Sequence, residues 1–329
     1  MTRIVVVGAG AMGTVHAHAW SRIDGAELGG VVGRTPTRAG PLAARLGVPL
    51  LPDVRAVLDD PTIDAVDVTV PSALPRELVT AALERGKHVF CETPLAPTIA
   101  DVDAIAATAH RTGRLLQVAL LQRVADLTVE ARAIVRGGTL GRPRVVTTER
   151  LWPGLDQIAD PTDHHGDALE ELALFDFDWL VWTFGLPRRV AARAAASTGA
   201  AVDHAVVSLD WSDIHATVET SRRLPASFPF RLGARIECEG GALEWTLRFP
   251  APDRPPDVRF MRFPRRGAAA AITTPPRDPY EAECRHFLAV LDGRADPALL
   301  SAESARDGVR VVEAARAAIS RNTTVEVAG

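Results

Sequence analysis

The sequence predicts an α/β protein: an N-terminal Rossmann domain with a doubly wound parallel sheet, then a C-terminal α+β domain with a large open, mainly antiparallel sheet. Residues 1–122 alternate short β-branched runs with helical stretches, which is typical of a parallel sheet. Beyond them, strand-like segments follow one another with few helices, which favours antiparallel pairing. A chain of 329 residues also exceeds the roughly 250–300 residues that one core supports. We expect domains at 1–122 and 123–329, with a C-terminal helix able to pack back on the first domain.

The first element is a strand, Ile4–Val7, that runs into the glycine-rich turn Gly8-Ala-Gly10-Ala11-Met12-Gly13 and a helix to Trp20. Gly8 permits a tight turn, Gly10 lets the backbone approach a pyrophosphate, and Gly13 lets the helix pack closely on the strand. The N–H groups of the helix start favour a bound phosphate. The motif therefore predicts a dinucleotide site that includes Ala11 and Met12; the alternative is an ordinary glycine turn.

The remaining elements alternate in the first domain and then change rhythm. Further strands are expected at Leu28–Val32, Ala65–Val70, His88–Phe90 and Leu115–Ala119, with helices at Thr37–Leu46, Pro75–Arg85 and Ala100–Thr112. After a helix at Leu127–Arg136, strands are expected at Arg144–Trp152, Arg189–Ala196, Ala205–Trp211, Ala216–Ser221, Arg235–Cys238, Leu243–Leu247 and Val258–Arg262. One long helix, Ala168–Phe184, interrupts these strands, and helices at Pro279–Leu291 and Ser301–Ser320 close the chain.

The end of the second strand predicts the cofactor. In a Rossmann unit, a carboxylate there binds the ribose 2′-hydroxyl of NAD, whereas an arginine accommodates the 2′-phosphate of NADP. This strand ends in Gly33-Arg34-Thr35, followed by Arg38, with no carboxylate. The pattern favours NADP over NAD; the alternative is that both arginines are simply solvated.

Two further segments resemble a known family. They are Val70-Pro71-Ser72 and Gly86–Pro94, the second containing Glu92-Thr93-Pro94; the glycine motif also continues to His16. Together they are similar to the glucose–fructose oxidoreductase/inositol dehydrogenase (Gfo/Idh/MocA) family over the whole chain. The resemblance implies cofactor contacts from these two segments, the nicotinamide at the domain junction with the substrate above it, and an open sheet that often mediates oligomers. A homodimer or homotetramer is expected through that sheet.

Four positions depart from the family pattern, and one of them is Pro75, which stands where the turn that begins at Val70 usually has a histidine. Members that act on an alcohol–ketone pair usually carry a lysine at Thr93, and an aspartate and a histidine at Glu171 and Phe175. Hydride transfer to a carbonyl needs a group that stabilises or protonates the developing alkoxide. Threonine is a weak acid and phenylalanine has no proton to give, so the proton must come from another group or the substrate must already be protonated, as an iminium is.

Replacement catalysts are predicted at the start of the long helix. His164 and His165 precede it, and an adjacent aspartate can orient an imidazole. The alternative is a polar loop whose Asp167 caps the helix. A metal site is not expected, because adjacent histidines point apart and the spacing matches no common zinc pattern. Glu171 is the candidate on the helix itself, with Glu170 as its competitor.

Candidate substrate contacts are Arg123, Leu121, Trp152 and Phe175. The resemblance places substrate contacts at Arg123, and Leu121 stands where relatives often have a polar residue. This pocket is therefore expected to be more apolar than a typical sugar pocket.

Net charge, apolar runs and cysteine spacing argue against several classes of function. The net charge of −4 without a basic tail gives no reason to expect nucleic acid, and no run approaches the roughly 20 apolar residues of a membrane span. The three cysteines form no C-x-x-C pair, so a reduced, cytoplasmic protein is expected.

The first hypothesis is an NADP-dependent oxidoreductase that transfers hydride between the nicotinamide and a small carbonyl or imine in biosynthesis, rather than a plain free sugar. The second is a lyase, isomerase or hydrolase that uses bound cofactor transiently or structurally, and the third is a catalytically silent NADP-binding protein.

Overall fold

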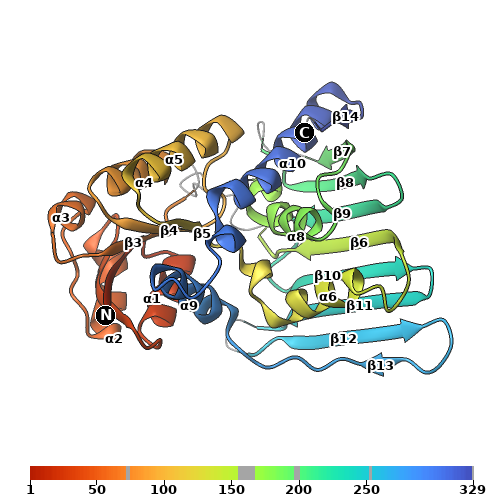
Figure 1. The fold of residues 1–329 in the computed structure, drawn as a ribbon, viewed down its shortest axis with the longest axis horizontal. Helices are drawn as coiled ribbons and strands as arrows, with labels where there is room; N and C mark the ends of the chain where they lie inside the picture. Colours follow the sequence, from red (N-terminus) through yellow and green to blue (C-terminus); the bar gives the residue numbers. More distant parts are fainter. Residues whose placement is uncertain (72–74, 155–166, 196–200, 252–253, 328–329) are drawn as a thin grey trace. The chain divides into compact units, whose positions relative to one another are not determined.

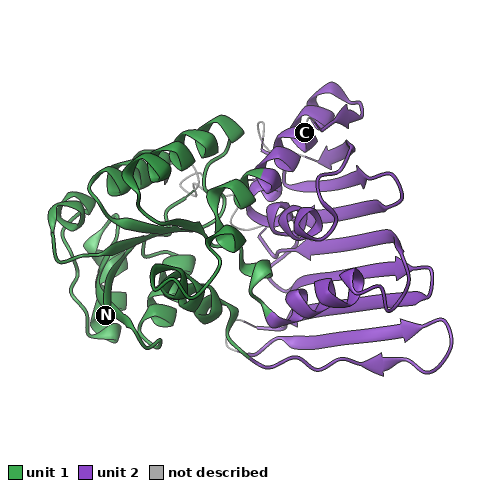
Figure 2. Cartoon of the chain, in the orientation of Figure 1, with its two compact units in different colours: residues 1–125, 277–306 green, residues 126–276, 307–329 purple. Residues whose placement is uncertain are grey.

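The computed structural model describes the chain except for residues 72–74, 155–166, 196–200, 252–253 and 328–329. It contains two compact units (Figure 2). Unit 1 comprises Met1–Ala125 and Arg277–Arg306, and unit 2 comprises Asp126–Pro276 and Asp307–Gly329. The expected second domain, 123–329, is therefore not one continuous segment in the structure. Residues 277–306 group with unit 1 because their helix packs on the first helix of the chain.

Unit 1 is a five-stranded parallel sheet with strand order β2-β1-β3-β4-β5 (Figure 1). Its strands are β1 (Thr2–Val7), β2 (Ala26–Val32), β3 (Ala65–Val68), β4 (His88–Cys91) and β5 (Leu116–Val118). Its helices are α1 (Ala11–Trp20), α2 (Pro36–Leu46), α3 (Val54–Asp59), α4 (Pro75–Glu84), α5 (Ile99–Thr112) and α9 (Pro279–Leu291), with the short turns η1 (Leu121–Arg123) and η3 (Pro297–Leu300). The expected doubly wound parallel sheet is confirmed.

The core of unit 1 explains its apolar strands. Ile4–Val7 is buried throughout, as expected for a central parallel strand that is covered on both faces. On one side, Trp20, Phe90 and Phe287 meet ring to ring, with centroids 5.7–6.0 Å apart. Phe287 belongs to α9, so this late helix completes the core that the early strands begin.

Unit 2 is built on a nine-stranded sheet with strand order β13-β12-β11-β10-β6-β9-β8-β7-β14. Its strands are β6 (Pro143–Leu151), β7 (Arg189–Ala195), β8 (His204–Asp210), β9 (His215–Ser221), β10 (Phe230–Cys238), β11 (Gly241–Phe249), β12 (Asp257–Pro264), β13 (Ala270–Ala271) and β14 (Val325–Glu326). All adjacent strands pair antiparallel except β6 and β9, which are parallel. The expected large, mainly antiparallel sheet is confirmed.

One face of this sheet carries the core of unit 2. Along β8, Ala205, Val207 and Leu209 are buried, while the alternate residues are half-buried. The helices α6 (Asp126–Arg136), α8 (Leu174–Phe184) and the later part of α10 (Ala302–Arg321) contribute apolar side chains to the same core, and Figure 1 shows them over one side of the strands. Among the described residues, the alternate face has no helix over it; we refer to it as the open face.

The start of the long helix differs from the expectation. Residues Leu169–Ala173 form a π-helical turn before α8 begins, so the expected helix from Ala168 to Phe184 has two parts. Such turns occur frequently at functional sites. Within the part of the chain that the structure describes, no helix is both long and apolar enough to cross a membrane.

Candidate active site

The glycine turn after β1 has the geometry that its sequence predicts. Gly8 has φ +126°, and a Cβ added there would lie 2.4 Å from Thr69 Oγ1. A Cβ at Gly13 would lie 2.1 Å from the Gly8 carbonyl oxygen, whereas a Cβ at Gly10 would meet nothing within 4 Å. Gly8 and Gly13 therefore permit backbone close packing, and Gly10 leaves open space beside the turn.

The N-terminus of α1 is suited to an anion. Its N-cap residue is Gly10, no side chain caps the helix there, and its first turn holds no acidic residue. Free N–H groups and the positive end of the helix dipole would face a phosphate at this place. Ala11 and Met12, two of the predicted contacts, form the first residues of this helix. The chain therefore fits a dinucleotide by its own backbone geometry.

The end of β2 brings three predicted cofactor residues to the surface. A Cβ at Gly33 would lie 2.5 Å from Ala39 Cβ, so a larger residue would disturb the contact with α2. Arg34, Thr35 and Arg38 are exposed. Neither arginine has an ion-pair partner among the residues that the structure describes, so both guanidinium groups remain available to a phosphate.

The ends of β3 and β4 supply the next predicted contacts. Val70 is half-buried and Pro71 is exposed just after β3, while Ser72 lies outside the described residues. Glu92 follows β4, and its Oε2 accepts a hydrogen bond of 2.8 Å from the Thr93 backbone N–H. Since the strands of this sheet are parallel, these residues lie at the same edge as the glycine turn.

Sequence reasoning missed a buried ionic cluster behind this edge. His16 Nδ1 lies 2.8 Å from Asp67 Oδ2, and His16 Nε2 lies 2.9 Å from Glu92 Oε1. Trp20 Nε1 donates to Asp67 Oδ2 at 2.6 Å, and Glu283 Oε1 lies 3.6 Å from His16 Nε2. The glycine motif that continues to His16 was the only signal, because the partners are 51 and 76 residues away in sequence.

Burial and the neighbouring charges shift the pKa values in this cluster in opposite directions. Burial lowers the pKa of His16, but the Asp67 and Glu92 carboxylates outweigh it and hold the pKa well above its ordinary value. Burial raises the pKa of Glu283 well above its ordinary value, and the nearby His16 only partly offsets this. At neutral pH the arrangement therefore favours a charged His16 and an uncharged Glu283.

Unit 2 has a polar group of its own at the π-helical turn. Asp167 caps it: Oδ1 accepts from the Leu169 and Glu170 N–H groups at 3.1 and 3.2 Å. Arg316 of α10 pairs with Asp167 and Glu170, each at 2.6 Å. Glu171 Oε2 lies 3.4 Å from Arg222 Nη1. Both candidate glutamates are thus paired with arginines.

The two family positions on this helix share an accessible side. Glu171 and Phe175 are half-buried, while the residues between them are buried. The Arg150 guanidinium lies 5.0 Å from the centre of the Phe175 ring and pairs with Asp176 at 2.9 Å. Phe175 therefore stacks on a buried ion pair and offers no acid–base group.

The other predicted site residues have different outcomes. His164 and His165 lie outside the described residues. Arg123 is buried and donates to the carbonyls of Leu299 and Ser304, both at 3.2 Å, so it ties segments of unit 1 together, and its contact with a substrate stays a prediction. The reason is that η1 packs beside the returning segment 277–306.

The two remaining substrate candidates are half-buried. Leu121 begins η1, and Trp152 packs against Phe230 with ring centroids 5.0 Å apart. That either residue contacts a substrate stays a prediction.

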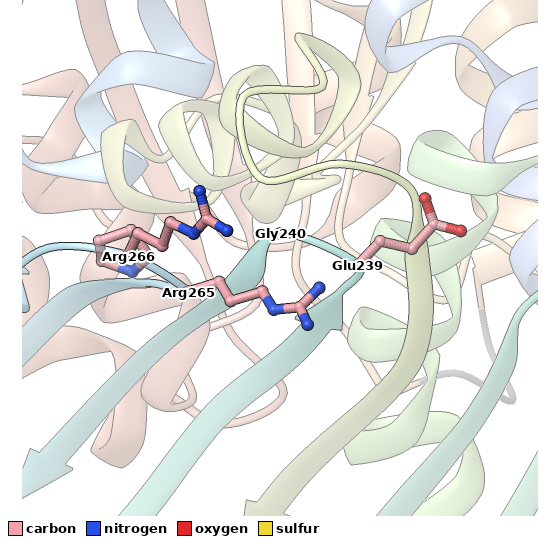
Figure 3. Close-up of a pocket in the computed structure, with 5 residues that line it drawn as sticks. Glu239, Gly240, Arg265 and Arg266 are labelled. Carbon is pink, nitrogen blue, oxygen red and sulfur yellow. The ribbon is translucent and has the colours of Figure 1, made fainter.

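A hollow of about 440 Å³ lies elsewhere in unit 2 (Figure 3). It is lined by Glu239 and Gly240 from the turn after β10 and by Pro264, Arg265 and Arg266 at the end of β12. The Glu239 carboxylate already pairs with Arg144, whose Nε lies 3.1 Å away. None of the predicted catalytic or cofactor residues lines this hollow. Among the described residues, no group of His, Cys, Asp or Glu is arranged to hold a metal ion.

Comparisons with known proteins agree with this geometry. A model of an oxidoreductase family with an NAD-binding Rossmann fold, GFO_IDH_MocA, matches residues 2–120, and the GFO/IDH/MocA C-terminal domain matches residues 128–244. An inositol 2-dehydrogenase from Acidothermus cellulolyticus is 28% identical over 96% of this chain and 91% of its own. A D-xylose 1-dehydrogenase (NADP(+)) from Haloferax volcanii is 27% identical over 84% of this chain and 85% of its own. The solved aldose-aldose oxidoreductase from Caulobacter crescentus has a TM-score of 0.84 at 23% identity and covers 99% of both chains.

Proposed function

Because the chain belongs to the Gfo/Idh/MocA family of NAD(P)-dependent oxidoreductases, we propose that it transfers hydride between NADP and a small substrate of the sugar or polyol class. The observation that carries the proposal is the turn of Gly8, Gly10 and Gly13, which leaves an open, uncapped helix start. The relatives' names support an alcohol–carbonyl pair as the reacting group. An imine is the other candidate class of substrate, because the chain lacks the lysine and the histidine that would protonate an alkoxide.

The preference for NADP rests on the end of β2. Arg34 and Arg38 are exposed, and no carboxylate stands beside them to bind a ribose 2′-hydroxyl. A guanidinium pairs with a phosphate through parallel hydrogen bonds, and Arg34 can also stack on an adenine. Thr35 adds a hydroxyl group. A relative that uses NADP by name is consistent with this preference.

The roles of the chain's residues follow from the geometry. Gly10, Ala11 and Met12 would hold the pyrophosphate, and the Glu92–Thr93 turn would lie at the nicotinamide side of the sheet edge. The bound nicotinamide supplies or accepts the hydride. Thr93 offers a hydroxyl group where relatives have a lysine, so it can donate a hydrogen bond to the reacting oxygen but not a full charge.

The proton requires a separate group. Glu171 is half-buried, its Oε2 lies 3.4 Å from Arg222 Nη1, and its carboxylate is the candidate to accept a proton during alcohol oxidation. His164 and His165 remain the predicted donors for the reverse direction. Phe175 cannot serve, because a phenyl ring has no proton to give or to accept.

The open face of the unit 2 sheet supports the proposal of a homodimer or homotetramer. It carries charged side chains in pairs, such as Arg231 with Glu149 at 2.8 Å and Arg259 with Glu244 at 3.4 Å. Because this face carries charges of both signs, the same face of two copies can bring opposite charges together across a two-fold axis.

The decisive experiment is fluorescence titration of the purified protein with NADPH and NADH, followed by turnover assays with inositols, aldoses and cyclic imines. We expect NADPH to bind at least about tenfold more tightly, and Arg34→Ala to remove most of this preference. Arg55→Ala, at an exposed position on α3, is the matched control. Equal binding of both cofactors would refute the NADP preference.

Turnover separates the remaining functions. Consumption of NADPH or NADP⁺ with any member of the panel supports hydride transfer. A cofactor that co-purifies, is never consumed and yet is needed for conversion of substrate would favour the lyase, isomerase or hydrolase alternative. Binding without any conversion would favour a silent binding protein.

A further inference from the structure

A charged cluster lies directly behind the cofactor edge of unit 1. It consists of His16 on α1, Asp67 on β3, Glu92 after β4 and Glu283 on α9, with Trp20 as a further donor to Asp67. The side chains of His16, Asp67 and Glu283 are fully buried, whereas 13% of the Glu92 side chain is exposed. Glu92 is therefore the member through which the cluster reaches the surface.

The hydrogen bonds indicate the charge on His16. Both ring nitrogens lie within hydrogen-bond distance of a carboxylate oxygen, Asp67 on one side and Glu92 on the other. A neutral imidazole donates through only one nitrogen, and the lone pair of the other would face a carboxylate. A doubly protonated ring satisfies both contacts. The stacked Phe90 ring, 5.6 Å away, fixes its plane.

The remaining members can then be assigned. Asp67 Oδ2 accepts from both Trp20 and His16, and the two oxygens of Glu92 accept from His16 and the Thr93 N–H, so each of these three oxygens faces a donor, while Asp67 Oδ1 has no partner among the described residues. Neither oxygen of Glu283 has a hydrogen-bond partner among the described residues, which favours its uncharged form. Two carboxylates and one imidazolium leave one surplus negative charge.

We propose that His16 is a positioning residue that holds Glu92 as a fixed anion at the cofactor edge, and that this anion makes the protein bind the oxidised, cationic nicotinamide more tightly than the reduced, neutral one. The proposal rests on the proposed function, since it assumes that a nicotinamide dinucleotide binds at this edge. A fixed charge in a partly buried place interacts more strongly with a cation than the same charge does in water. The cluster would thus set which redox state of the cofactor the resting protein holds.

The test is the ratio of two dissociation constants, for NADP⁺ and for NADPH, measured by calorimetric titration without substrate. Glu92→Gln keeps the size of the side chain and removes the charge, so we expect it to weaken NADP⁺ relative to NADPH by about five- to tenfold. Glu92→Asp keeps the charge and should retain most of the wild-type ratio. His16→Gln should also change the ratio, because it removes both the hydrogen bond that positions Glu92 and one positive charge of the cluster; an unchanged ratio would remove His16 from this role.

The control is His18→Gln, a histidine two positions away on the same helix and outside the cluster. It should leave the ratio unchanged. Equal changes of both dissociation constants in Glu92→Gln would overturn the inference while leaving the proposed function intact. Failure of the wild-type protein to bind either form would overturn the proposed function and this inference together. If His16→Gln does not fold, the Glu92→Gln and Glu92→Asp pair still decides the matter.

Discussion

Individual residues of the glycine turn show how closely local chemistry sets the fold here. Gly13 has no room for a Cβ because the Gly8 carbonyl is only 2.1 Å from where it would lie. Gly10, three positions earlier, has open space. Two glycines of one motif therefore have different reasons to be glycine: one for packing within the protein, the other for the approach of a ligand.

This difference gives a matched pair of variants. Gly13→Ala should destabilise unit 1 by about 1–3 kcal/mol, because backbone must move to admit the methyl group. Gly10→Ala should leave the melting temperature almost unchanged but weaken dinucleotide binding by tenfold or more, since its methyl group would occupy the space that the phosphate needs. Thermal unfolding and fluorescence titration of both variants check this. A Gly13→Ala protein as stable as the wild type would contradict the packing argument.

The buried pair of His16 and Glu283 predicts a pH dependence of stability. Both groups have folded pKa values above their ordinary values, so the folded state holds protons that the unfolded chain releases. Their contributions are complete below the ordinary pKa values and are lost as the pH rises through the folded ones. Within that window, each such group lowers the free energy of unfolding by about 1.4 kcal/mol for every unit by which the pH rises.

Glu283→Gln tests this sign. The amide stays neutral at every pH, so the variant should lose less stability than the wild type between pH 5.5 and 8.5. Melting temperatures at several pH values give the two slopes. Parallel slopes for the two proteins would mean that Glu283 is not the buried proton carrier.

These residues also mark what the sequence could and could not predict. The glycine turn and its strand are local, so spacing alone predicted both. The His16 cluster joins four elements, and nothing in the neighbourhood of His16 identifies Asp67 or Glu283 as its partners. His164 and His165 stay predictions, as does the role of Glu171.

At the scale of elements, the long helix of unit 2 shows tertiary contacts overriding a regular pattern. Its sequence predicts a continuous helix, but Leu169–Ala173 adopts a π-helical turn. Asp167 caps this turn and also accepts from the Val202 N–H at 3.3 Å, while Arg316 reaches it from α10. Three elements thus meet on one carboxylate, which no periodicity in the sequence reveals.

Asp167→Ala should therefore destabilise unit 2 by about 2 kcal/mol, the upper range of a helix cap. Asp278→Ala is the comparison, because Asp278 caps α9 by accepting from the N–H groups of Tyr280 and Glu281. No arginine pairs with Asp278 in the contacts described, so its loss should lower the free energy of unfolding by only about 1 kcal/mol. Urea unfolding of both variants measures the difference. Equal losses would show that the Arg316 and Val202 contacts add nothing beyond the cap.

At the scale of the whole molecule, the sequence predicted the two sheets and a C-terminal helix able to pack back on the first domain, but not which residues return. Short β-branched runs that alternate with helices predict the parallel sheet, and strands that follow one another with few helices predict the sheet of unit 2. The assignment of residues 277–306 to unit 1 depends on long-range packing of α9 against α1, which leaves no mark in local composition.

The open face gives the prediction that belongs to this scale. Thr217 lies in β9, near the middle of the sheet and on the face that alternates with the core residues Ala216 and Val218. If a second copy covers this face, Thr217→Arg should lower the molar mass in solution to that of one chain, with little change in unfolding. Light scattering after size exclusion measures it, with Arg55→Glu on α3 as control. An unchanged mass for Thr217→Arg would place any self-association elsewhere.

The late return of the chain to unit 1 has a consequence for its synthesis. When the ribosome has finished the five strands of the first sheet, Trp20 and Phe90 still lack Phe287, and His16 still lacks Glu283. The nucleotide-binding part of the protein must wait, with an incomplete core, until α9 has emerged, which follows every strand of the second sheet except β14. A premature stop anywhere before residue 277 would thus damage the part of the protein made first.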